Sequence, residues 1–124
     1  GIKRVIPLPV SAPFHCSLMQ PAAKSMEEAL AKESFNQPLV PVVSNVRAEA
    51  ETVPGVLKAL LVQQVTGRVR WRESVLKLKE LGITSIIEIG AGKVLTGLTK
   101  RIVPELEAFS LNTPADIDLF IQRF

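Results

Sequence analysis

The stretch at residues 84–89, Thr-Ser-Ile-Ile-Glu-Ile, constrains the fold of this chain more than any other. Its near-continuous apolar run lacks the regular alternation of apolar and polar side chains that a strand with one solvated face shows. Such a run is typical of a parallel strand that is covered on both faces. Gly90-Ala91-Gly92-Lys93 then leads directly into a helical pattern, whose apolar stripe consists of Val94, Leu95, Leu98 and Ile102. A strand, a glycine turn and a helix in this order predict an α/β protein.

Extended and helical patterns alternate over the rest of the chain. They predict extended segments at 2–10, 39–46 and 108–111, a polar loop at 47–52, and helices that begin near Ser17, Pro54, Arg70 and Pro114. Ser17 and Gln20 have the spacing of a capping box, and Gly67 and Gly82 stand where the second and third helices should end. We therefore expect an α/β fold with a partial parallel sheet of three or four strands, flanked by helices. At least one edge of that sheet should be apolar and unpaired, and such an edge normally lies against more protein.

Length and composition narrow the class of protein. A chain of 124 residues corresponds to about one domain, and 47% apolar with 22% charged residues is the balance of a globular protein. The net charge of +3 is only mildly basic. The basic residues between positions 68 and 79 are interrupted by apolar and acidic ones, which favours a solvated helix face over nucleic-acid binding. An acidic protein partner would also suit that face.

The single cysteine bears on the cellular compartment. One cysteine cannot form an internal disulfide, so the chain needs no oxidising environment. The sequence has no run of 18 apolar residues and no signal-peptide pattern. We therefore expect a cytoplasmic protein that does not bind membranes. Because Gly1 opens directly into a strand-like run without a methionine, we also expect the chain to be a piece of a longer protein.

Residues 10–19 contain the only histidine and the only cysteine of the chain. An imidazole can take and return a proton near neutral pH, so His15 is a candidate acid or base, although a lone histidine often has no catalytic duty. Cys16 as a nucleophile with His15 as its base is disfavoured, since neighbouring side chains point apart at the start of a helix. Two adjacent Cys and His residues also cannot supply the four ligands of a structural zinc site, so we expect no metal.

The glycine turn at 90–93 lies where phosphate-binding loops occur in α/β proteins. It matches no such loop, because Leu95 and Thr96 stand where a P-loop has Gly-Lys, and Leu95 also replaces the third glycine of the dinucleotide pattern. A tight turn that requires glycine explains it better. No Gly-x-Ser-x-Gly elbow occurs anywhere in the chain, so a complete serine acyltransferase is not encoded here.

Four groups of residues together resemble a known family. The chain is similar over essentially its whole length, and in the right order, to the C-terminal part of the malonyl-CoA:acyl carrier protein transacylases. The residues that carry the resemblance are the run 8–19, the run 41–46, Gln64 with Val69-Arg70-Trp71, and the run 88–98.

The resemblance implies a fold and an activity. The fold would be an α/β-hydrolase-like acyltransferase subdomain interrupted by a small ferredoxin-like one, with residues 1–124 as the C-terminal segment of the larger subdomain. The N-terminal half, with its serine elbow and the ferredoxin-like subdomain, would be absent. In this family a serine attacks malonyl-CoA by ping-pong chemistry, and the malonyl group then passes to the pantetheine thiol of acyl carrier protein. Malonyl-CoA, acyl carrier protein and the missing N-terminal part are thus the implied partners, and coenzyme A enters as substrate with no resident cofactor.

The resemblance also implies roles for three residues. His15 matches the catalytic histidine, which is the base for the serine and then the acid for the leaving thiol. Gln64 matches the residue whose main-chain carbonyl orients that imidazole. Phe14 matches a position where a bulky ring would exclude an α-methyl group and so select malonyl over methylmalonyl, although plain core packing is the alternative for this residue.

Because the nucleophile belongs to the implied N-terminal half, we expect the 124-residue chain to be inactive alone. The sequence leaves a second function open. The chain could be a non-catalytic interaction domain or a complementing subunit that descends from such an enzyme.

Overall fold

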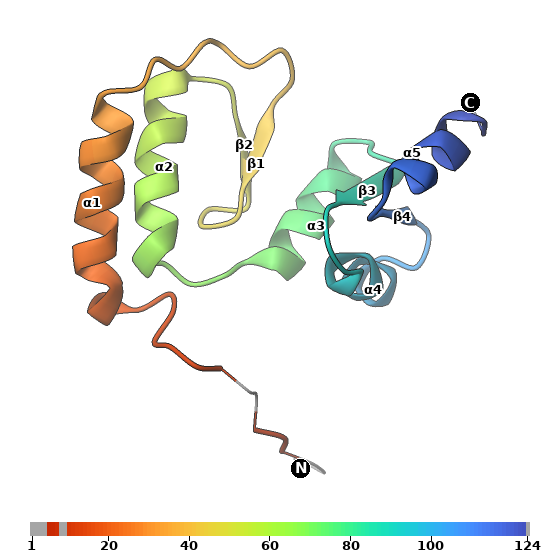
Figure 1. Cartoon of the computed structure of the whole chain (residues 1–124), viewed down its shortest axis with the longest axis horizontal. Helices are drawn as coiled ribbons and strands as arrows, with labels where there is room; N and C mark the ends of the chain where they lie inside the picture. Colours follow the sequence, from red (N-terminus) through yellow and green to blue (C-terminus); the bar gives the residue numbers. More distant parts are fainter. Residues whose placement is uncertain (1–4, 8–9, 124) are drawn as a thin grey trace.

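The computed structural model describes residues 5–7 and 10–123. Over these residues the chain forms helices and short strands in a mixed order (Figure 1). The elements are the 3-10 helix η1 (Ser17–Met19), α1 (Gln20–Ala31), β1 (Val42–Ser44), β2 (Glu49–Glu51), α2 (Pro54–Thr66), α3 (Trp71–Glu80), β3 (Ser85–Ile89), α4 (Val94–Ile102), β4 (Glu107–Leu111) and α5 (Pro114–Ile121).

The elements form two groups that the short segment between α2 and α3 connects (Figure 1). In the first group α1 packs along α2, where Ala23 and Leu60 are buried, and β1 and β2 lie beside α2. In the second group α3, α4 and α5 surround the strands β3 and β4. Helix α3 also contacts β1 and β2, so the two groups touch. No helix in the described part of the chain has the length and apolar character needed to cross a bilayer.

Strands β3 and β4 confirm the expected parallel pair. They run parallel from Ser85 opposite Glu107 to Ile89 opposite Leu111, and α4 connects them. The core of this group consists of Val75, Val103 and Leu106, with Trp71, Ile86 and Ile102 packed against it. An α/β fragment with a small parallel sheet is therefore the fold of this chain, as the apolar run at 84–89 predicts.

The expected number of strands in that sheet is wrong. The segment at 39–46 contributes only Val42–Ser44, and the supposed loop at 47–52 contains a strand, Glu49–Glu51, which pairs antiparallel with it. A tight turn joins the two, since Ala48 has φ 58° and its N–H donates to the Ser44 carbonyl at 2.6 Å. Within the described residues the parallel sheet thus has two strands, and this hairpin is a separate sheet.

The open edge of β3 is apolar, as expected. Strand β3 pairs only with β4 in the described part of the chain, and Ile87 and Ile89 are 40% and 77% exposed. The expectation that this strand is covered on both faces does not hold for this chain by itself. A parallel strand with exposed isoleucines normally packs against further protein.

The start of the chain differs from the sequence pattern at the first helix. Ser17 and Gln20 form no capping box: the caps of η1 and α1 are Cys16 and Met19, neither of which makes a side-chain cap. Pro21 lies in the first turn of α1. Because proline has no N–H, it leaves one unpaired backbone donor fewer at this helix end. The extended segment at 2–10 lies partly outside the described residues, and its described positions, 5–7 and 10, belong to neither helix nor strand.

Candidate active site

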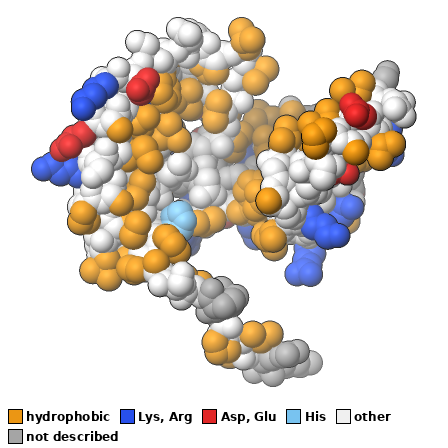
Figure 2. Space-filling view, in the orientation of Figure 1, with side chains coloured by type: hydrophobic (Ala, Val, Ile, Leu, Met, Phe, Trp, Pro, Cys, Tyr) orange, Lys and Arg blue, Asp and Glu red, His pale blue; other side chains and the backbone are white. Residues whose placement is uncertain are grey.

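His15 and Gln64 meet at the centre of the candidate site. The ring nitrogen Nδ1 of His15 lies 3.0 Å from the main-chain oxygen of Gln64. A carbonyl oxygen can only accept, so Nδ1 carries the proton of this hydrogen bond, and in the neutral imidazole Nε2 is then the free lone pair. His15 is exposed, and Figure 2 shows the histidine at the surface with hydrophobic side chains around it.

The position of Gln64 explains why its oxygen is available. Gln64 lies in the last turn of α2, where carbonyls have no partner within the helix. The helix ends at Thr66, and the N–H of Gly67 donates to the Gln63 carbonyl at 2.9 Å. The next carbonyl, that of Gln64, is then the one that accepts from His15.

The backbone of His15 is unusual. Its φ is 59°, in the left-handed region that costs a residue with a side chain on the order of 1–2 kcal/mol. Around it the Phe14 N–H donates to the Ala12 carbonyl at 2.9 Å, and the Met19 N–H to the Cys16 carbonyl at 3.0 Å. This tight bend lies next to α2, because η1 contacts both α1 and α2. Backbone strain of this kind is concentrated at functional sites.

Cys16 is not paired with His15. Its thiol donates to the Pro13 carbonyl at 3.1 Å, while the His15 ring is bonded to Gln64. The structure therefore gives no support to a Cys-His dyad, in keeping with the expectation that the two side chains diverge.

Phe14 is 56% exposed and so is not a core residue of this chain. Phe14 directly precedes His15 and lies on the same bend of the backbone. Core packing within the chain, the alternative to a role in selecting the acyl group, does not describe this side chain.

An apolar groove lies beside Gln64. It has a volume of about 340 Å³ and lies between α2, β1 and the segment before β1. Its lining residues are Phe35, Val42, Val43, Ser44, Asn45, Leu57, Leu60, Leu61 and Gln64. The groove is open to solvent on this chain, and an apolar surface next to a polar pair is typical of a site completed by further protein.

The glycine turn at 90–93 is a tight turn, as its sequence predicts. Gly90 and Gly92 have φ of 125° and 98°, where a side chain would be strained. The start of α4 is already occupied by a carboxylate: Glu88 accepts from the N–H of Leu95 at 3.2 Å and from the N–H and hydroxyl of Thr96 at 2.8 and 2.7 Å. The hydroxyl and the N–H groups hold the pKa of Glu88 below its usual value. A phosphate at this turn would have to displace that negative charge.

The described residues contain no cluster of three or more His, Cys, Asp or Glu side chains that could hold a metal ion.

Arg70 departs from the expected solvated face. Arg68 and Arg72 are exposed, but Arg70 is only partly exposed and bonds to the turn between β1 and β2. The sequence pattern alone indicates no function for Arg70 or Asn45. A signal was present, because Asn45 and Arg70 both lie in the runs that carry the family resemblance.

Comparison with known proteins gives close matches, although no protein-family model matches the chain. It is 50% identical over 115 residues to the malonyl CoA-acyl carrier protein transacylase of Escherichia coli, which covers 93% of this chain and 37% of the relative. It is 44% identical over 122 residues to the protein of the same name from Bacillus subtilis, covering 98% of this chain and 38% of the relative.

Solved structures agree with the sequence matches. An acyl-carrier-protein-S-malonyltransferase from Bartonella henselae superposes with a TM-score of 0.88 at 46% identity, covering 98% of this chain and 38% of that one. A malonyl-transacylase in complex with a type II PKS acyl-carrier protein superposes with a TM-score of 0.87 at 42% identity, covering 98% and 40%. The chain thus spans about two fifths of the length of the relatives it matches.

Proposed function

We propose that this chain, which matches a C-terminal portion of the malonyl CoA-acyl carrier protein transacylases, supplies the general base of such an enzyme. The reaction is the transfer of malonyl from coenzyme A to acyl carrier protein. The observation that carries the proposal is the hydrogen bond from His15 Nδ1 to the Gln64 carbonyl, in a chain that is 50% identical over 115 residues to a transacylase. A histidine held in this way presents Nε2 to a reacting group.

The proposed chemistry has two half-reactions. In the first, His15 Nε2 takes the proton of a serine hydroxyl while that oxygen attacks the thioester carbonyl of malonyl-CoA, and the protonated Nε2 then gives the proton to the departing coenzyme A thiolate. In the second, Nε2 takes the proton of the pantetheine thiol of acyl carrier protein as the sulfur attacks the acyl-serine ester. The serine oxygen leaves and regains that proton.

Gln64 is proposed to orient the ring throughout. Its carbonyl holds the proton on Nδ1 and adds no formal charge, unlike the aspartate of a triad. The carbonyl also belongs to the C-terminal turn of α2, whose partial negative charge faces the positive charge that the imidazole carries after each proton transfer.

The remaining parts of the proposed machinery come from outside these residues. The serine, the oxyanion donors and a cation for the malonyl carboxylate would lie in the part of the relatives that this chain does not match, so we propose that the chain alone is inactive. The apolar groove beside Gln64 and the open edge of β3 are the surfaces against which that part would pack.

Acyl carrier protein and malonyl-CoA are the proposed partners, with coenzyme A as part of the substrate and no resident cofactor. We propose a cytoplasmic location, since a single cysteine requires no oxidising compartment. Phe14, exposed on the bend beside His15, is proposed to restrict the site to malonyl.

A chimeric enzyme tests the proposal. Residues 1–124 would replace the portion of the Escherichia coli transacylase that they match, and transfer of malonyl to acyl carrier protein would be measured. We expect the chimera to be active, the isolated chain to be inactive, and His15→Asn in the chimera to lower kcat by about 100- to 10,000-fold. A folded but inactive chimera would favour the non-catalytic interaction domain, and an active His15→Asn chimera would remove the histidine from the mechanism.

A further inference from the structure

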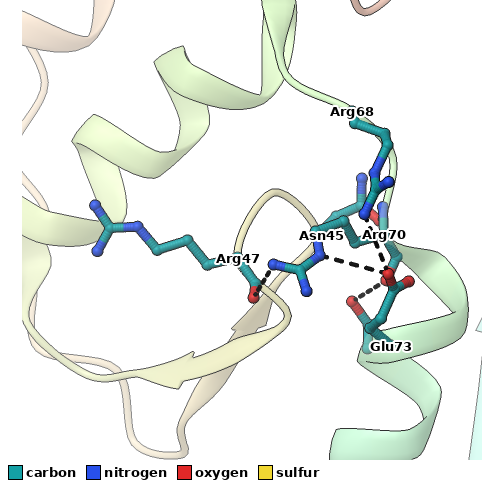
Figure 3. Close-up of polar contacts among 6 residues, drawn as sticks. Asn45, Arg47, Arg68, Arg70 and Glu73 are labelled. Carbon is teal, nitrogen blue, oxygen red and sulfur yellow. Dashed lines mark hydrogen bonds and ion pairs between the residues drawn. The ribbon is translucent and has the colours of Figure 1, made fainter.

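The carbonyl that binds His15 belongs to the last turn of α2, and a polar network lies close to the segment that follows this helix. The network, here called the Arg70 network, comprises Asn45, Arg47, Arg68, Arg70 and Glu73 (Figure 3). It connects the turn between β1 and β2 to the start of α3, and the segment from Gly67 to Arg70 that leaves α2 lies between them.

Gly67 shows how closely that segment packs. A Cβ atom on Gly67 would lie 2.7 Å from Val46 Cγ2 and 2.9 Å from the Gln63 carbonyl oxygen. The end of α2 therefore touches the turn between β1 and β2 directly, and a displacement of that turn would displace the end of the helix.

Arg70 holds the turn at more than one point. Its main-chain N–H donates to both the carbonyl and the side-chain oxygen of Asn45, each at 3.2 Å. Its Nη1 donates to the main-chain oxygen of Arg47 at 3.1 Å, and Figure 3 shows the Arg47 side chain pointing away from this contact. The turn is therefore bound mainly through its backbone.

Glu73 fixes the guanidinium of Arg70 from the other side. Its carboxylate lies 3.6 Å from Arg70 Nε and 3.4 Å from Arg68 Nη2. Nε of Arg70 is buried and has no hydrogen-bond partner of its own within the described residues, so the ion pair with Glu73 is its compensating interaction. The backbone at the start of α3, together with Arg70 and Arg68, holds the pKa of Glu73 below its usual value, so the carboxylate stays charged at neutral pH.

We propose that Arg70 is a positioning residue for the candidate active site. The main-chain N–H of Arg70 binds Asn45 in any variant, whereas its guanidinium binds the Arg47 carbonyl; this guanidinium contact fixes the exit of α2, and thereby keeps the Gln64 carbonyl within hydrogen-bond distance of His15 Nδ1. Without it the carbonyl moves away, the bond exceeds the limit of about 3.5 Å, and the neutral ring becomes free to carry its proton on Nε2. A ring with its proton on Nε2 cannot act there as a base.

This inference rests on the proposed function only in treating His15 as the base, and its test does not require activity. His15 is the only histidine of the chain, so the ¹⁵N signals of its ring can be assigned without ambiguity in the labelled 124-residue protein. Their shifts, measured where the ring is neutral, distinguish a proton on Nδ1 from one on Nε2. The variants are Arg70→Gln and, as a matched control, Arg72→Gln at an exposed position of α3.

We expect the wild type and Arg72→Gln to show the proton on Nδ1, and Arg70→Gln to show a shift toward a mixture of the two tautomers. The amide spectrum and a urea unfolding curve establish that each variant is folded. If Arg70→Gln does not fold, Arg70→Lys replaces it. Lysine keeps the positive charge opposite Glu73, but it lacks the guanidinium that contacts Glu73 and the Arg47 carbonyl at the same time. A folded variant at position 70 that keeps the wild-type tautomer overturns the proposal.

The chimeric enzyme adds a second measurement. There Arg70→Gln should lower kcat by about 10- to 100-fold and leave KM nearly unchanged, since a misplaced base affects the chemical steps more than substrate binding. A shifted tautomer in an inactive chimera would uphold the positioning role and contradict the proposed function. An active chimera whose Arg70→Gln variant keeps the Nδ1 proton and full kcat would support the proposed function and contradict the positioning role of Arg70.

Discussion

His15 Nδ1 lies 3.0 Å from the main-chain oxygen of Gln64, although 49 positions separate the two residues in sequence. The histidine belongs to an irregular bend before η1, and the carbonyl belongs to the last turn of α2. Each has a local peculiarity that serves the contact: a left-handed backbone at His15, and a helix end that leaves the Gln64 oxygen free. A ring held at one nitrogen by a main-chain group has a defined free nitrogen, which a proton-transferring residue requires.

Replacing Gly67 by alanine should destabilise the protein. The added Cβ would meet Val46 Cγ2 and the Gln63 carbonyl at less than 3.0 Å, and the backbone oxygen cannot turn away. We expect a loss of about 1–3 kcal/mol in the free energy of unfolding, measured in urea. Gly97→Ala is the matched control: it lies inside α4 with nothing within 4 Å of its Cβ position, so it should be neutral or stabilise by about 0.5–1 kcal/mol. Equal effects of the two substitutions would show that the contact at Gly67 relaxes freely.

Replacing Phe14 by serine in the chimera should relax the choice of acyl group. The smaller side chain leaves room for an α-methyl group beside His15, so kcat/KM for methylmalonyl-CoA relative to malonyl-CoA should rise by about 10-fold or more. The two thioesters would be compared in competition. Leu18→Ser, at another exposed apolar residue near the bend, should leave the ratio unchanged. An unaltered ratio for Phe14→Ser means that this ring does not select the substrate.

The effect of Glu88→Gln on stability should depend on pH. Hydrogen bonds from Thr96 and Leu95 lower the pKa of Glu88 in the folded protein below the usual value of a glutamate. The folded state therefore binds this proton less readily than the unfolded state, so the stabilisation is present above about pH 4.5 and is lost as the pH falls through the folded pKa. Unfolding of wild type and Glu88→Gln in urea should differ most near pH 7 and converge at low pH. Glu28→Gln on the exposed face of α1 serves as the control, and a difference for Glu88→Gln that stays constant with pH would contradict the assignment.

Nucleotides and inorganic phosphate should not bind at the 90–93 turn. The Glu88 carboxylate already accepts from the N–H groups at the start of α4 and would repel a second anion. Titration of the labelled chain should leave the amide signals of Gly90, Gly92 and Lys93 in place. Saturable shifts of these signals at low ligand concentration would mean that the carboxylate can be displaced.

Local sequence pattern was sufficient where a side chain meets the core of this chain or where the backbone has a strict requirement. The apolar run at 84–89 predicted β3, because Ile86 packs against the core formed by Val75 and Val103. The glycines at 90 and 92 predicted a tight turn, since a positive φ is a property of the single residue.

The pattern failed where an element depends on a distant partner or on competing local options. Strand β2 is a polar segment of three residues, and it is a strand only because β1 supplies its hydrogen bonds. The spacing of Ser17 and Gln20 allows a capping box, but Ser17 lies inside η1 and Gln20 follows it, so neither residue is the N-cap of a helix. A capping box does form at the start of α5, between Thr113 and Asp116. Arg70 has the sequence context of a solvated helix face, yet its partners Asn45 and Arg47 lie more than 20 positions earlier.

The sequence by itself determined the α/β class, the glycine turn and the presence of one histidine beside a helix start, because periodicity and residue type express these locally. A resemblance between sequences pointed to Gln64 as the partner of that histidine. Only the tertiary structure decided the contact itself, through the packing of α1 on α2, the contact of η1 with α2 and the point at which α2 ends. A hydrogen bond across 49 residues needs its two atoms placed to within a few tenths of an ångström, and no pattern around position 15 contains that information.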